Sequence, residues 1–148
     1  MIDSLITLFK RDLTALKKEI NLYNNEENLW NVEGDVSNCA GNLCLHIVGN
    51  LNHFVGSQLG NTGYVRKRDL EFSLKNVPVD ELNKQVDDTI AMIESSLVKL
   101  NQEDLQQSYP LEVFGYAMTN EYFLLHLGMH LAYHLGQVNY HRRLLDNT

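Results

Sequence analysis

Four of the six histidines lie in one C-terminal stretch, residues 122–145, and their spacing suits metal binding. His126, His130 and His134 are four residues apart, so a helix would place them on successive turns, with neighbouring Cβ atoms roughly 5–6 Å apart. Two imidazoles from one helix and a third from a facing helix would form a three-histidine site, with one position left for water or substrate. The stretch therefore predicts a column of imidazoles that could hold a divalent metal ion.

Two of these histidines fall on the apolar seam of the predicted helix, where leucine would be expected. A buried imidazole nitrogen without a partner costs roughly 1–3 kcal/mol. A single inward histidine is ordinarily a hydrogen-bonded core residue, whereas several converging histidines favour a metal. The seam consists of Phe123, Leu127, His130, His134, Val138, His141 and Leu145.

A second predicted helix, residues 38–59, carries His46 and His53, and either could supply the third imidazole. One of its rows starts apolar and turns polar through histidine, asparagine and serine, and no charged residue occurs between positions 36 and 65. Uncharged polar groups on such a helix suggest a partly buried polar surface that lines a cavity. Asn50 lies one turn from His46 and is expected to position a substrate or to bond a backbone carbonyl.

Gln137, close to one turn beyond His134, is likewise expected to position a substrate or to bond a backbone carbonyl.

Other metal chemistries in a helical bundle fit less well. No histidine is preceded by an acidic residue three positions earlier, which disfavours a di-iron carboxylate site, and the pattern H-E-x-x-H is absent. Bis-histidine haem ligation stays open, although the attachment sequence C-x-x-C-H is missing.

The composition narrows the class of protein further. The net charge of −7 disfavours nucleic-acid binding. The two cysteines are too few for a disulfide scaffold, so we expect reduced thiols and a cytoplasmic location, with no membrane span. The basic cluster at residues 66–68 predicts an exposed charged loop, with contact to an anionic substrate as the alternative.

The elements that must position these histidines are four predicted helices, residues 2–23, 38–59, 78–100 and 119–145. The first has an apolar stripe in heptad-like steps, and Asn38 and Thr119 are candidate N-caps. The connections 24–38, 60–78 and 102–118 show no clear period. Four helices of about 20 residues predict an all-α fold, a four-helix bundle in one domain over residues 1–148, and the long 60–78 connection permits a crossover between the second and third helices.

Two motifs resemble those of the DinB/YfiT-like superfamily of metalloenzymes. The run HLAYHLGQVNYH, residues 130–141, is similar to that superfamily's C-terminal pattern H-x-x-x-H-x-G-Q, and LHIVGNLNHF, residues 45–54, resembles its other histidine segment. The resemblance implies an up-down-down-up bundle in which His46, His130 and His134 hold a divalent metal, commonly zinc or nickel. Whether His53 or His126 replaces His46 or joins the site stays open at this point.

The same resemblance implies a function and a partner. Some members transfer a low-molecular-weight thiol, so the leading expectation is a metal-dependent transferase, with a hydrolase that activates a water as an open alternative. Asn50 and Gln137 would position the small-molecule substrate, and a homodimer is expected. Where members often carry an arginine after the last histidine, this chain has Leu135. The competing hypothesis is a non-catalytic metal-binding or structural bundle.

Overall fold

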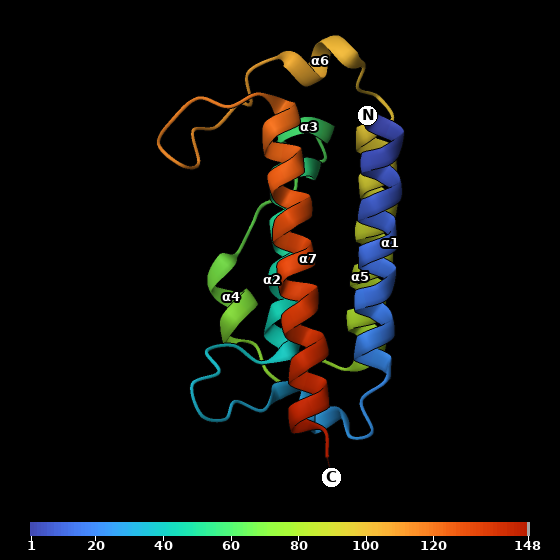
Figure 1. Ribbon diagram of the computed structural model, residues 1–148, viewed down its shortest axis with the longest axis vertical. Helices are drawn as coiled ribbons and strands as arrows, with labels where there is room; N and C mark the ends of the chain where they lie inside the picture. Colours follow the sequence, from blue (N-terminus) through green and yellow to red (C-terminus); the bar gives the residue numbers. More distant parts are fainter. Residues whose placement is uncertain (148) are drawn as a thin grey trace.

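Four long helical segments run along the long axis of the molecule (Figure 1). The computed structural model describes residues 1–147. Within this range the chain is helical with no strand, apart from an isolated bridge between Ser108 and Thr119, so the all-α prediction is confirmed for this part of the chain. The long segments are α1 (Ile2–Asn21), α2 (Ala40–Leu51) with its continuation, α5 (Val79–Leu97) and α7 (Asn120–Leu145).

The direction of the helices explains the long connection in the middle of the chain. In Figure 1, α1 and α7 run down the view, whereas α2 and α5 run up it. The chain must therefore travel back along the molecule between α2 and α5. On this return lies α4 (Arg68–Ser73), which packs against α2. Helix α1 contacts α5 and α7, and α2 contacts α5 and α7, which encloses the core.

The predicted apolar stripe of the first helix is buried as expected. Phe9, Leu13 and Leu16 of α1 are almost completely inaccessible to solvent. Burying each such side chain contributes roughly 1.5–3 kcal/mol. At the edge of this stripe, Lys10 and Lys17 pair with carboxylates of α5 at 2.7 Å, and such exposed pairs contribute little stability.

The start of α7 was predicted correctly and the start of α2 was not. Thr119 caps α7, because its hydroxyl accepts a hydrogen bond from the Tyr122 N–H at 3.1 Å. Asn38 does not cap α2, since Cys39 holds that position. The Cys39 thiol lies 2.9 Å from the Asn42 Oδ1 and donates to it, so this end of α2 has no side-chain cap.

Three short helices occupy connections that were predicted to be irregular. They have six residues or fewer, too few for a helical period to show in the sequence. These helices are η1 (Glu26–Trp30), α4 and α6 (Gln102–Gln106). Asn101 and Asp104 form a reciprocal capping box at the start of α6.

The second long segment changes its hydrogen-bond pattern halfway. After α2 the chain enters η2, a π-helix (Asn52–Ser57), and ends in α3 (Gln58–Gly60). The carbonyl of Phe54, inside the π-helix, accepts a hydrogen bond from the Tyr109 hydroxyl at 2.7 Å. Single π turns often occur beside functional sites, and this one directly follows the helix that carries His46.

No helix within residues 1–147 is both long and apolar enough to cross a membrane.

Candidate metal centre

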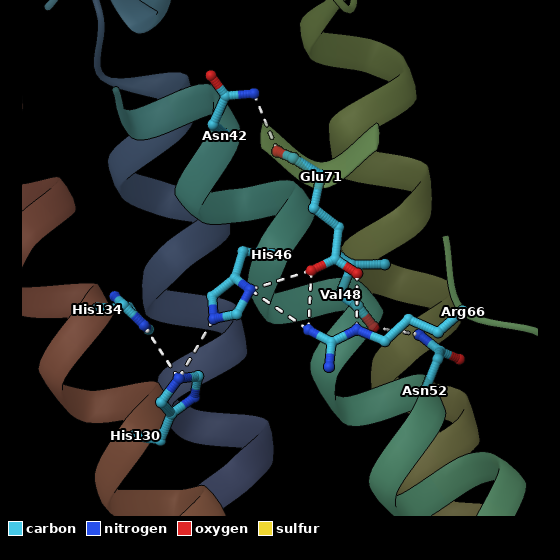
Figure 2. Close-up of polar contacts among 8 residues, drawn as sticks. All are labelled: Asn42, His46, Val48, Asn52, Arg66, Glu71, His130 and His134. Atoms are coloured by element: carbon cyan, nitrogen blue, oxygen red, sulfur yellow. Dashed lines mark hydrogen bonds and ion pairs between the residues drawn. The ribbon is translucent and has the colours of Figure 1, made fainter. Parts of the chain in front are cut away.

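Three imidazoles from two helices point at one another between α2 and α7 (Figure 2). The Nε2 atom of His130 lies 3.3 Å from that of His46 and 3.0 Å from that of His134. All three residues can offer a ligand atom within 4.8 Å of the others. Nitrogens around a tetrahedral zinc ion at about 2.0–2.1 Å are separated by roughly 3.3–3.4 Å. The spacing of these nitrogens is therefore close to what a shared ion requires.

Two of the three rings are held through their other nitrogen. His46 Nδ1 lies 3.0 Å from Oε1 of Glu71, and His134 Nδ1 lies 2.7 Å from Oε1 of Gln137. A carboxylate or amide oxygen accepts hydrogen bonds, so each Nδ1 carries the proton and donates. In the neutral rings, the Nε2 atoms of His46 and His134 are then unprotonated, and both lone pairs face His130.

This arrangement leaves more acceptors than donors at the centre of the site. His130 Nε2 can carry one proton and satisfy one of the two facing lone pairs. The other lone pair would have no donor among the three rings. A metal ion resolves this mismatch, because it accepts a lone pair from all three nitrogens at once. The donor set therefore fits a divalent metal, and the three histidines could hold one.

The electrostatics of the site favour neutral imidazoles. Burial, reinforced by the neighbouring histidines, lowers the pKa of His130 from 6.5 to about 4. Burial also lowers the pKa of His134, against an opposing effect of the Gln137 hydrogen bond. Metal ligation requires the deprotonated ring, so both residues are in the binding form at neutral pH.

Glu71 is the main residue of the candidate site that was not predicted. Its buried carboxylate accepts from His46 and also from Arg66, whose Nε and Nη2 both lie 2.8 Å from its oxygens. Burial alone would raise the pKa of Glu71, but the hydrogen bonds from His46 and Arg66 outweigh burial and hold this pKa below its ordinary value. Arg66 was expected in an exposed loop; instead its side chain is only 12% exposed.

The local sequence contained one signal for this carboxylate. Gly49 lies inside the continuous helical segment formed by α2 and η2, where glycine is unfavourable by roughly 0.5–1 kcal/mol relative to alanine. A Cβ at Gly49 would overlap the Glu71 carboxylate, so only glycine lets that side chain reach His46. Asn42, two turns earlier, fixes α4 in place by donating to the carbonyls of Glu71 and Leu74 at 2.9 and 2.8 Å.

A cavity of about 410 Å³ adjoins two of the three rings, those of His46 and His130. Asn50 lines it and is 7% exposed, its Oδ1 is fully buried, and neither end of its amide forms a hydrogen bond within residues 1–147. The alternative that Asn50 bonds a backbone carbonyl is therefore wrong. The cavity is lined by His46, Asn50, Phe54, Arg66, Arg68, Val113, Phe114, Phe123, His126, Leu127 and His130.

The remaining histidines lie outside the cluster of three. His126 stacks on Phe123 with ring centroids 5.7 Å apart and lines the cavity. His53 belongs to η2 and packs against Phe54 at 4.7 Å. His141 is buried elsewhere, at the C-terminal end of α7. Of the two candidates on the second helix, His46 is the one that the fold brings to the pair on α7.

Comparison with known proteins gives a family without an activity. A family model described as "Protein of unknown function (DUF1572)" matches residues 1–148. No curated protein matches the chain. The chemistry of the site therefore has to be inferred from its own residues.

Proposed function

Because this chain belongs to the family DUF1572, whose description assigns no activity, we propose its function from the site itself: a divalent-metal-dependent enzyme that acts on a small molecule. The observation that carries the proposal is the convergence of Nε2 atoms from His46, His130 and His134, two of which are acceptors facing a third. Three neutral imidazoles form the ligand set of many catalytic zinc sites.

We also assign the chain to the DinB/YfiT-like superfamily, with an up-down-down-up four-helix bundle in a single domain. The helix directions in Figure 1 support this topology, as does the return of the chain past α4. The pattern of His130, His134, Gly136 and Gln137 at the expected places supports the superfamily.

Zinc or nickel is the metal that we propose, since imidazole ligands suit both. When bound, the ion would act as a Lewis acid that lowers the pKa of a coordinated thiol or water. Glu71 and Gln137 fix the orientation and protonation of two ligand rings, a role that typically changes metal affinity by about 10–100-fold. Because the Gln137 oxygen is engaged by His134, Asn50 is the residue that we assign to substrate positioning.

The reaction class that we propose is transfer of a low-molecular-weight thiol, with hydrolysis as the alternative. The cavity beside the histidines has a volume typical of small-molecule sites, which are roughly 300–1,000 Å³. His130 and His46 line both the candidate metal site and this cavity, so a substrate placed there would lie next to the ion.

One observation favours a second candidate, a metal-binding bundle without turnover. No carboxylate lines the cavity, and the nearby Glu71 is already engaged by His46 and Arg66. The described residues therefore offer no free carboxylate as a general base there.

We further propose a cytoplasmic homodimer that does not bind nucleic acid. The net charge of −7 would repel a phosphate backbone. The outer face of α7 supports self-association, because it exposes a row of large apolar side chains that a second copy could cover. This row consists of Tyr122, Leu125, Met129, Tyr133, Tyr140 and Leu144.

Metal analysis of protein purified without a nickel column tests the ligand assignment. We expect about one zinc or nickel ion per chain and loss of the ion in His46→Ala, His130→Ala and His134→Ala. His126→Ala is the matched control, because this histidine is on the same face of α7 but outside the cluster. Full metal content in the three ligand variants would refute the assignment.

Turnover separates the two candidates. Purified metal-loaded protein would be assayed with small thiols and electrophilic acceptors, and compared with protein stripped by a chelator. Metal-dependent product formation supports the transferase, whereas stoichiometric metal without turnover across thiols and hydrolysable esters supports the binding bundle.

A further inference from the structure

The cavity beside the histidines combines basic groups with an apolar wall, although the protein as a whole is acidic. Two arginines, Arg66 and Arg68, line the cavity, and no aspartate or glutamate does. Arg68 forms no ion pair within residues 1–147; its guanidinium lies 5.2 Å from the centre of the Phe72 ring. A chain of net charge −7 thus leaves an unpaired guanidinium beside this cavity.

Arg66 adds directional donors to the same cavity. Its Nε and Nη2 are bound by Glu71, and Figure 2 shows the remaining nitrogen of the guanidinium pointing away from that carboxylate. Its Cζ atom lies 5.6 Å from the centre of the Phe54 ring. Arg66 is therefore held rigidly with one end still free to donate, while Glu71 offsets much of its charge.

Asn50 supplies an independent sign of a ligand. Its side chain is more than nine-tenths buried, lines the cavity and has no hydrogen-bond partner within residues 1–147. The buried Oδ1 is an acceptor left without a donor, at a cost of roughly 1–3 kcal/mol, which a ligand group that donates a hydrogen bond would remove. The amide Nδ2, separately, is a donor that can bind an anionic group in the cavity.

The other wall of the cavity is made of rings and aliphatic groups. Phe54 and Phe123 meet edge to face at 5.2 Å, and Phe114 packs on His126 at 4.7 Å. Phe114 is nevertheless 42% exposed, which leaves apolar surface available to a ligand. Burying apolar area there contributes roughly 25 cal/mol per Å².

We propose that this cavity binds an organic anion with an apolar body, whose charged group is recognised by Arg68, the free end of Arg66 and the Asn50 amide, and whose body packs on Phe54, Phe114 and Phe123. The inference rests on the proposed function, because it names the substrate class of the same site. The two arginines favour an anion over a neutral or cationic compound of the same shape.

Three matched compounds test the proposal: 3-phenylpropionate, its neutral amide and 3-phenylpropylamine. Binding would be measured by calorimetry on the full chain, both loaded with zinc and stripped of metal, with the zinc content determined separately. We expect the carboxylate to bind about tenfold more tightly than the amide in both forms, which corresponds to about 1.4 kcal/mol, and the amine to bind most weakly. Equal binding of amine and carboxylate, or no binding of the carboxylate, would overturn the proposal.

Variants localise the effect. Arg68→Gln is expected to weaken carboxylate binding about tenfold while leaving amide binding and zinc content unchanged. Lys67→Gln removes the same charge from the neighbouring residue, which does not line the cavity, and is expected to change carboxylate binding less than about twofold. Equal losses in the two variants would reduce the effect to the general field of the protein and refute the site.

The outcome for the metal is read independently. If neither the wild type nor any variant binds zinc, the proposed metal-dependent function is refuted. The preference of the metal-free protein for the carboxylate over the amide would still test the role of the arginines. If zinc binds but the carboxylate has no advantage, the metal site stands and the anion site is refuted.

Discussion

Two buried regions of this protein, one around His141 and one around His46, His130 and His134, use the same side chain in opposite ways. At the C-terminal end of α7, His141 has both ring nitrogens matched by protein groups: Nδ1 lies 2.7 Å from the Tyr23 hydroxyl, and Nε2 lies 2.8 Å from the Asn31 carbonyl. The carbonyl can only accept, so Nε2 carries the proton and Nδ1 accepts from Tyr23. Between α2 and α7, by contrast, the lone pairs of His46 and His134 both face a third imidazole.

Counting donors and acceptors separates a structural histidine from a candidate ligand more clearly than burial does. His141 is 5% exposed and His46 is 7% exposed, so burial alone would rank them together. What differs is whether the protein supplies a proton donor for each lone pair. The cluster around His141 is complete without a ligand, and the cluster of His46, His130 and His134 is not.

The largest expected difference between the clusters is their response to zinc. At free zinc about a thousandfold above the dissociation constant, the free energy of unfolding of the wild type should rise by about 4 kcal/mol. The same gain is expected in His141→Phe, and none in His130→Ala. Urea unfolding with and without zinc measures it, and an equal gain in His130→Ala would contradict the distinction.

Removing the structural histidine should affect stability more than metal binding. His141→Phe leaves the Tyr23 hydroxyl and the Asn31 carbonyl without a partner, which should lower the free energy of unfolding by about 3 kcal/mol. In metal-free protein, His134→Phe should cost less than about 1 kcal/mol, because it removes one acceptor from a cluster that has too many. A larger cost for His134→Phe would reverse our assignment of the two clusters.

The carboxylate behind His46 should tune metal affinity. Glu71→Gln is expected to weaken zinc binding by about 10–100-fold, because His46 loses a charged acceptor, while zinc still binds at saturating concentration. Glu19→Gln is the control: Glu19 pairs with Arg142 at 2.7 Å, away from the site. Competition with a chelating dye measures both, and equal losses would show that Glu71 has no specific role.

Two glycine substitutions should distinguish a helix position that packs against the histidine site from one that has open space beside it. Gly49→Ala forces the Glu71 carboxylate away from His46 and should lower both zinc affinity and stability, by about 1 kcal/mol or more in the free energy of unfolding. Gly128→Ala, in α7, meets nothing within 4 Å and should raise stability by roughly 0.5–1 kcal/mol. Thermal unfolding compares them, and stabilisation by Gly49→Ala would contradict the packing described for Glu71.

The smallest effect is expected in the pH dependence of the metal-free protein. The pKa of His130 is lowered to about 4 in the folded protein, so as the pH falls the unfolded chain takes up a proton at this residue before the folded protein does. The free energy of unfolding should therefore fall as the pH drops from about 6.5 towards 4. Asp146, near His141, has a pKa below 3.8: burial alone would raise it, but hydrogen bonds from Asn28 and the Asn24 N–H outweigh burial. The contribution of ionised Asp146 to the free energy of unfolding should therefore be lost only below about pH 3.8.

The variant His130→Phe separates these two acid transitions. It should reduce the loss of stability between pH 6.5 and 4 and leave the loss below about pH 3.8 in place. Unfolding in urea at a series of pH values measures this, and an unchanged profile would assign the upper transition to other groups.

The sequence by itself determined the helical class and the approximate extent of the long helices, because these depend on local apolar periodicity and on caps such as Thr119. It also indicated that His130 and His134 share a face, since four residues nearly complete one helical turn. The choice between His46 and His53 could not be made from geometry alone. Seven residues correspond to roughly 10.5 Å along a helix, and which of them faces α7 depends on how far α2 is displaced along it.

Only the tertiary structure revealed the partners of these histidines. Glu71 and Arg66 come from a connection without a helical period, and they reach His46 because α4 docks on α2 where Gly49 leaves room. The missing partner of Asn50 is likewise a property of everything packed around it. Local patterns encode which face of a helix is buried, but hydrogen-bond satisfaction is decided by residues far apart in the chain, and so it becomes visible only when the chain is folded.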